Sequence, residues 1–169
     1  MKMFKKIMAV ALTAVMAVSM LTGCAVTDAM KKTNVLKAMG DVATAACEQS
    51  GSTVTKVKFE EKSNLNTKVN SLVKNAKAED VAALDGTVSE GKYLVATVKV
   101  KSDTLSVSNF KDLYAHELLG SLMEAGNPPA VEYSNNNKTA TIKAGVKVDS
   151  FKNAENKTEY YAIVLVEKA

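Results

Sequence analysis

The spacing of hydrophobic positions changes along the chain, and each spacing predicts a type of element. Over residues 34–50 and 109–125, apolar side chains recur every three or four positions, which is typical of helices with one buried face. Over 53–60 and 92–101 they alternate with polar side chains, which is typical of strands. The full set predicted is three helices over 34–50, 63–76 and 108/109–125, a short helical turn over 78–84, and strands over 53–60, 92–101, 130–134, 139–148 and 159–167.

The order of these elements predicts an α+β fold. Helices and strands alternate at first, but three strands in succession close the chain, which favours an antiparallel or mixed sheet over a doubly wound parallel one. We expect about five strands, with about three helices packed mainly on one face. The strand over 159–167 is apolar on both of its faces, which predicts a central, covered position. Asn34 is the expected N-cap of the first helix, and Asn135–Asn137 are expected to form a turn.

The N-terminal segment has a different pattern. Lys2, Lys5 and Lys6 precede an apolar run over 7–21, which is too short to span a bilayer as a permanent helix but fits the hydrophobic region of an export signal. A conventional signal or a membrane-anchor helix is the alternative. If the segment is an export signal, the expected organisation is a signal peptide over 1–23, a short tether over 24–33 and one α+β domain over 34–169.

The end of that run suggests a more specific signal. Leu21, Thr22, Gly23 and Cys24 follow it directly, and in this the segment resembles the lipobox of bacterial lipoprotein precursors. The resemblance covers residues 1–24 only. It implies cleavage after Gly23 and a thioether-linked diacylglycerol on Cys24, and it leaves open a further acyl chain on the new amino terminus. It further implies an exported protein, anchored by its lipid to the extracytoplasmic face of a bacterial membrane. Two acyl chains hold a protein stably on a bilayer, whereas one does so only marginally.

Charge speaks against a nucleic-acid partner. The chain has 22 basic and 18 acidic residues, and every basic residue is lysine. Three of the lysines lie in residues 1–23, so nineteen face eighteen acidic residues in the remainder. A reader of nucleic acid normally uses arginine forks and a basic surface. We therefore expect none as a partner.

The two cysteines have different expected roles. A thioether on Cys24 would leave Cys47 without a disulfide partner. Cys47 lies among alanines in a helical pattern, and we interpret it as a small buried hydrophobic residue. A nucleophilic or metal-binding role is the alternative.

Candidates for chemistry are few. His116 is the one histidine, and Asp112 and Glu117 lie close to it on the third predicted helix. Asp112 could orient His116 as a general base, although the chain has no nucleophile motif of the G-x-S-x-G type. Two ligands are too few for zinc, and an incidental pairing on a helix surface is the simpler interpretation.

Two other groups in the C-terminal part have a structural alternative. Oxygen-bearing side chains gather near the last turn, but their spacing does not match a calcium loop, so we interpret them as a solvated turn and expect no metal; they are Asp149, Asn153, Glu155 and Glu159. Tyr160 and Tyr161 must point to opposite faces of their strand, where they form either part of the core or a binding patch.

Three functional classes remain open. The first is a non-catalytic lipoprotein domain that binds an envelope protein or polymer through an exposed sheet face or edge. The second is a carrier of a small ligand, or an inhibitor of an envelope enzyme, with a groove between helices and sheet. The third is an envelope hydrolase that uses His116. No cofactor is expected apart from the covalent lipid.

Overall fold

The computed structural model of the protein describes residues 27–84, 88–89, 91–102, 105–124 and 128–169. The expected signal peptide, and with it Leu21, Thr22, Gly23 and Cys24, lies outside these residues. The elements in chain order are α2 Asp28–Gln49, β1 Lys56–Glu61, α3 Ser63–Leu72, α4 Ala78–Ala82, β2 Val88–Ser89, β3 Tyr93–Val100, α5 Val107–Phe110, the π-helical turn η1 Lys111–Ala115, α6 His116–Glu124, β4 Glu132–Ser134, β5 Thr139–Lys152 and β6 Thr158–Glu167.

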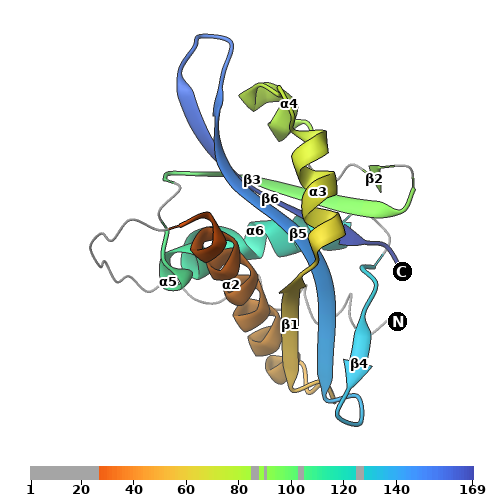
Figure 1. Cartoon of the computed structure of the whole chain (residues 1–169). Helices are drawn as coiled ribbons and strands as arrows, with labels where there is room; N and C mark the ends of the chain where they lie inside the picture. The colour runs from red at the N-terminus through yellow and green to blue at the C-terminus, as the bar shows by residue number, and fades with distance from the viewer. Residues whose placement is uncertain (1–26, 85–87, 90, 103–104, 125–127) are drawn as a thin grey trace.

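The strands form one mixed sheet in the order β1-β5-β6-β3-β2 (Figure 1). Strand β1 runs parallel to β5, and the other pairs are antiparallel. Ala144 pairs with Glu61 of β1 on one side and with Val166 of β6 on the other. Strand β4 pairs with the beginning of β5, so β4 and β6 follow one another along the same edge of that long strand. The predicted α+β class with a mixed sheet is confirmed.

Helices pack on both faces of the sheet. Helix α2 and the continuous segment α5–η1–α6 pack on one face, where they bury alternate side chains of β1, β3, β5 and β6. Helices α3 and α4 pack on the opposite face, against Val95, Ile163 and Leu165. The two longer helices thus share one face, as expected. The helix over 63–76 lies on the other because its apolar stripe, Leu65 and Val69, meets the second buried side of β6.

Strand β6 is the centre of the core. Its residues Tyr161–Val166 are all buried, and its odd and even positions belong to the two different apolar clusters. The central position predicted from its sequence is therefore confirmed. The turn at Asn135–Asn137 is confirmed as well, with φ of 54°, 53° and 64°, a left-handed conformation that asparagine tolerates better than most residues.

The first helix begins earlier than predicted. Thr27 is the N-cap, and its Oγ1 accepts a hydrogen bond from the Met30 amide at 3.3 Å. Asn34 lies inside the helix, and its side chain donates to the Leu105 carbonyl at 3.1 Å. The expected tether over 24–33 is therefore helical from Asp28 onward. Threonine is a favourable N-cap, and Asp28 in the first turn interacts favourably with the positive end of the helix dipole. These two interactions allow the helix to begin before its apolar stripe.

The third helix also starts earlier, at Val107, because Ser106 accepts a hydrogen bond from the Asn109 amide at 3.2 Å and caps it. Ser108 and Asn109, the expected starting residues, lie in its first turn. A π-helical turn precedes His116 and adds a residue to the helix without breaking it. The predicted apolar stripe is buried along its whole length; it consists of Phe110, Tyr114, Leu118 and Leu122.

Helix α2 closes the outer edge of β1. The Thr44 hydroxyl accepts a hydrogen bond from the Val57 amide at 2.9 Å and is 3.3 Å from the Val57 carbonyl oxygen, to which it donates. At Gly40 a side chain would begin 3.0 Å from the same carbonyl oxygen, so the helix can approach the strand only because this position has no Cβ. An edge strand covered in this way cannot pair with another chain along that stretch.

Candidate functional site

One half of the sheet has a face that no helix covers. Helices α3 and α4 lie over β6 and the second part of β5, whereas β1, the first part of β5 and β4 carry outward side chains that are exposed or half-buried. We call this surface the polar sheet face; it consists of Lys56, Lys58, Glu60, Glu132, Ser134, Thr139, Thr141 and Lys143.

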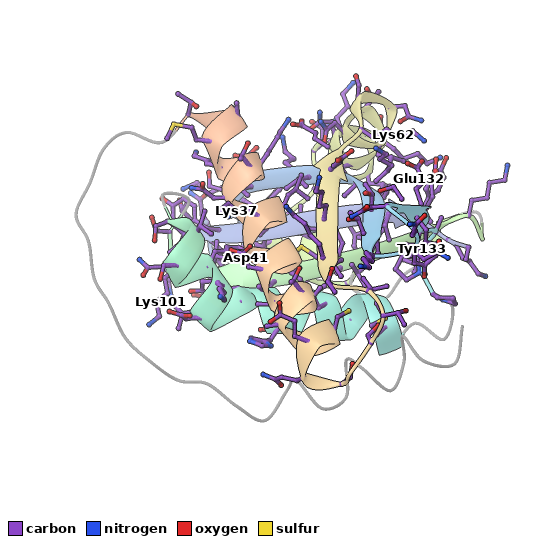
Figure 2. All side chains as sticks on the ribbon, turned by 90° about the horizontal axis from the view of Figure 1, so that it is seen from below. Lys37, Asp41, Lys62, Lys101, Glu132 and Tyr133 are labelled. Carbon is purple, nitrogen blue, oxygen red and sulfur yellow. The ribbon has the colours of Figure 1, made fainter. Side chains whose placement is uncertain are left out.

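Strand register brings these residues together from three separate segments. Lys58 of β1 lies beside Thr141 of β5, which lies beside Glu132 of β4. Lys56, Thr139 and Ser134 form the neighbouring row in the same way. In Figure 2, Glu132 and Tyr133 lie with Lys62 on one side of the molecule, and Lys37 and Asp41 of α2 lie on the other.

Lys143 links the charges on this face. Its Nζ is 2.5 Å from Glu60 Oε2 and 3.7 Å from Glu132 Oε2. The hydrogen bond from Lys143 lowers the pKa of Glu60, and the same bond raises the pKa of Lys143. Such exposed pairs contribute little to stability, so they do not explain why the face is charged. Together with Lys56 and Lys58, these three residues give the polar sheet face charges of both signs.

The structure does not join His116 to its expected partners. His116 is half-buried at the first position of α6, whereas Asp112 and Glu117 are exposed. No hydrogen bond or ion pair connects the three side chains among the residues that the structure describes. The arrangement therefore does not support a hydrolytic centre built on His116.

The oxygen-bearing side chains of the last turn have hydrogen-bond or ion-pair partners close to them in the chain or in the β5–β6 hairpin. Asn153 Oδ1 accepts hydrogen bonds from the amides of Glu155 and Lys157 at 3.0 and 2.9 Å. Asp149 pairs with Lys147 at 3.1 Å. Glu155 pairs with Lys157 at 2.6 Å. These partners account for the clustering in structural terms. Within the described ranges, no group of three or more metal-ligating side chains is close enough to hold an ion.

Glu159 is the most connected member of this group. Lys99 Nζ lies 3.0 Å from Glu159 Oε2, Asn153 Nδ2 donates to Oε1 at 3.0 Å, and the Tyr161 hydroxyl donates to Oε2 at 3.2 Å. The hydrogen bond from Lys99, followed by that from Asn153, lowers the pKa of Glu159 below its ordinary value of 4.5. Burial raises the pKa of Tyr161.

Lys99→Met is expected to raise the pKa of Glu159 toward 4.5, although the bonds from Asn153 and Tyr161 persist. Because the folded-state pKa lies below the unfolded one, the pairing stabilises the fold above about pH 4.5, and this contribution is lost as pH falls through the folded-state pKa. A ¹³C NMR titration of the Glu159 carboxyl group measures the shift. The control is Lys56→Met on β1, which leaves the midpoint unchanged; an unchanged midpoint in Lys99→Met would contradict the assignment.

Cys47 and the tyrosine pair belong to the core. Cys47 is 1% exposed, and burial raises the pKa of its thiol, so the interpretation as a buried hydrophobic residue is confirmed. Tyr161 packs edge-on against Phe151, with ring centres 6.2 Å apart. Tyr160 packs against the opposite apolar cluster. Neither ring forms an uncovered patch, so the core alternative holds for both.

A cleft of about 230 Å³ lies between the start of α2, helix α3 and β5. Its lysines already have partners: Lys147 donates to Asn70 Oδ1 at 3.2 Å, and Lys32 donates to Glu61 Oε1 at 3.3 Å. Pockets for small ligands are usually larger, about 300–1,000 Å³, and mostly apolar. This cleft is therefore a weak candidate for the groove of a small-ligand carrier.

The polar sheet face had only a partial signal in the sequence. Alternation in 53–60 and 139–148 indicates that Lys56, Lys58 and Lys143 point outward. It does not indicate that β1 and β5 are neighbours or that α3 stops short of them. Helix length and strand pairing decide which outward side chains stay uncovered.

In comparisons with known proteins, no family model, no curated protein and no solved structure matches the chain. Within the part of the chain that the structure describes, no helix is long and apolar enough to cross a membrane.

Proposed function

We propose that the protein is a lipid-anchored lipoprotein of the bacterial cell envelope whose domain binds an envelope protein or polymer without catalysing a reaction. The anchor is proposed from Leu21, Thr22, Gly23 and Cys24, because their resemblance to a lipobox implies a diacylglycerol on the cysteine. The binding role is proposed from the fold.

The polar sheet face is the single observation that carries the binding role. Helices α3 and α4 pack over β6 and the second part of β5, but the half formed by β1, β4 and the first part of β5 presents charged and hydroxyl side chains in aligned rows. The hydrogen-bonded strands fix the backbone positions from which these side chains project, so the backbone of this surface needs little ordering on binding. Opposite charges side by side favour a partner of complementary charge pattern.

The other two functional classes have less support. A carrier of a small ligand, or an inhibitor of an envelope enzyme, is expected to use a groove between helices and sheet. The cleft between Asp28 and Asp149 lies there, but its lysines are already paired. A hydrolase would depend on His116, whose side chain forms no hydrogen bond or ion pair with Asp112 or Glu117 among the described residues. The polar sheet face therefore remains the better basis for a function.

Photocrosslinking in intact cells tests the role of this face. A photoreactive amino acid in place of Lys58, in the middle row of the face, is expected to give a discrete adduct. The matched control replaces Lys37, an exposed lysine of α2, which lies on the other face of the sheet and is expected to give no such adduct. One protein band would identify a protein partner, and a ladder sensitive to a cell-wall hydrolase would identify a polymer.

Charge reversal separates specific binding from chance proximity. Lys56→Glu, next to the crosslinker, is expected to reduce the Lys58 adduct about tenfold, which corresponds to about 1.4 kcal/mol of binding free energy. Lys37→Glu is expected to leave it unchanged. Equal adducts at positions 37 and 58, or a Lys58 adduct unaffected by Lys56→Glu, would contradict the proposed surface.

A further inference from the structure

Helix α2 begins at one particular end of the sheet. Lys32, near its start, pairs with Glu61 at the carboxyl end of β1, at 3.3 Å. Thr44, about three-quarters along the helix, binds Val57 near the beginning of β1. Helix α2 therefore runs antiparallel to β1, and Thr27, the first described residue, lies at the end of the molecule where β1 finishes.

The β5–β6 hairpin extends past the same end. Strand β5 runs parallel to β1 and continues from Ala144, the last residue paired with β1, to Lys152. Asp28 lines the same cleft as Val148 and Asp149, so the start of α2 lies beside the middle of this extension. The rest of the hairpin projects beyond it; Figure 1 shows the hairpin tip at the top of the molecule and β4 at the bottom.

The chain between Cys24 and this end is very short. Three residue steps separate Cys24 from Thr27, and at up to about 3.6 Å per residue they span at most about 11 Å. From Asp149 to Lys152 the hairpin rises by about 10 Å at 3.4 Å per residue. The reach of the chain is therefore about equal to the projection of the hairpin strands.

We infer that the domain is held end-on against the lipid bilayer, with the β5–β6 turn over 153–157 and the start of α2 at the lipid headgroups. The inference rests on the proposed lipid at Cys24. A thioether at that residue places its sulfur at the membrane surface, and the short chain then brings the projecting turn there too. Met30, 51% exposed in the first turn of α2, lies at the same end.

Charge does not drive this contact. The turn carries Lys157 and Glu155 as a pair at 2.6 Å, and Asp28 lies 3.5 Å from Lys31 at the start of α2. The charges within each pair balance, and Glu79 of α4, whose Oε1 accepts a hydrogen bond from the Ala154 amide at 2.7 Å, adds a negative charge beside the turn, so anionic lipid gains little from these groups. The short tether sets the orientation because it keeps this end of the domain close to the bilayer. This effect of chain length does not depend on the salt concentration.

The orientation places the polar sheet face away from the membrane. Its outer row, with Lys56 and Thr139, lies at the opposite end of β5 from the hairpin turn. A strand of this length spans about 45 Å at 3.4 Å per residue. The face is therefore accessible to a partner located in the envelope outside the bilayer.

The test compares two exposed lysines at opposite ends of β5. Lipidated protein from cells, carrying Cys47→Ala, receives a single new thiol by Lys157→Cys or by Lys138→Cys. Each is labelled with a fluorophore and reconstituted into vesicles of phosphatidylcholine and phosphatidylglycerol with a headgroup-attached quencher. Quenching is expected to be several-fold stronger at position 157. It is expected to persist when salt rises from about 0.1 M to about 1 M, which shortens the Debye length from about 10 to about 3 Å.

A lengthened tether provides the control. A 20-residue Gly-Ser insertion between Val26 and Thr27 adds about 25 Å of mean reach. It is expected to lower quenching at position 157 to the level at position 138. Equal quenching at both positions without the insertion, loss of the difference in high salt, or no effect of the insertion would each overturn the inference. Failure of the protein to float with vesicles would instead contradict the lipid anchor, and flotation is measured first on the same samples.

Discussion

Gly145→Ala is expected to lower the free energy of unfolding by about 3 kcal/mol or more, a large part of the 5–15 kcal/mol typical of a domain. A Cβ at Gly145 would overlap the carbonyl group of Leu65 and lie 2.8 Å from the Asn66 amide nitrogen. These are backbone atoms of the first turn of α3, so no side-chain rotation relieves the overlap. The turn would have to move away from β5.

That movement would also break two hydrogen bonds between the start of α3 and the backbone of β5. Asn66 Oδ1 accepts a hydrogen bond from the Val146 amide at 2.8 Å, and the Lys62 amide donates to the Ala144 carbonyl at 2.8 Å. A buried amide left unpaired costs about 1–3 kcal/mol. Urea unfolding followed by circular dichroism measures the change.

Gly120→Ala is the matched control. Gly120 lies in α6, and a Cβ there meets no atom within 4 Å. Alanine favours the helix by about 0.5–1 kcal/mol over glycine, so this variant is expected to be as stable as the parent or more so. Equal stability of the two alanine variants would show that α3 does not lie against β5 at Gly145.

Cys24→Ala is expected to abolish maturation of the protein at the membrane. If Cys24 carries the diacylglycerol, the parent protein from cells has lost residues 1–23 and gained the mass of the lipid. Each buried CH₂ of an acyl chain contributes about 0.8 kcal/mol, so two chains hold the protein until detergent is added. The variant is expected to keep the intact mass of all 169 residues and to incorporate no labelled fatty acid.

Cys47→Ala is the control for this experiment. Cys47 is buried in α2 and forms no disulfide, so its loss is expected to leave processing and fatty-acid labelling unchanged. It removes only a small buried group and lowers stability by about 1 kcal/mol. A parent protein with the unprocessed mass, or fatty-acid labelling that survives Cys24→Ala, would contradict the anchor.

The positions of the main elements could be predicted because their patterns are local. In β3, Leu94, Ala96, Val98 and Val100 face one apolar cluster, as their alternation indicated. The buried stripe that runs from Phe110 to Leu122 likewise follows helical spacing. The starts of helices were less predictable, since Thr27 and Ser106 cap their helices one or more turns before the apolar stripe begins. Capping depends on single hydrogen bonds, which hydrophobic spacing does not report.

The candidate site was less predictable than the fold. His116 with Asp112 was suggested by helical spacing, but spacing alone does not create a contact between side chains. The polar sheet face needs β1, β4 and β5 side by side, and the segments that form it lie far apart in the chain. Glu60 and Lys143, for example, meet through a parallel pairing of residues 56–61 with residues 139–144.

The sequence by itself determined the α+β class, the central place of β6, the buried state of Cys47 and the resemblance to a lipobox at Cys24, because each depends on local patterns or on the order of those patterns along the chain. Only the tertiary structure decided that α3 lies on the second face, that Gly145 and Gly40 permit helices to approach strands, and that one half of a sheet face stays uncovered. These features depend on contacts between distant segments, which are fixed by how whole elements pack and not by the pattern within any one of them.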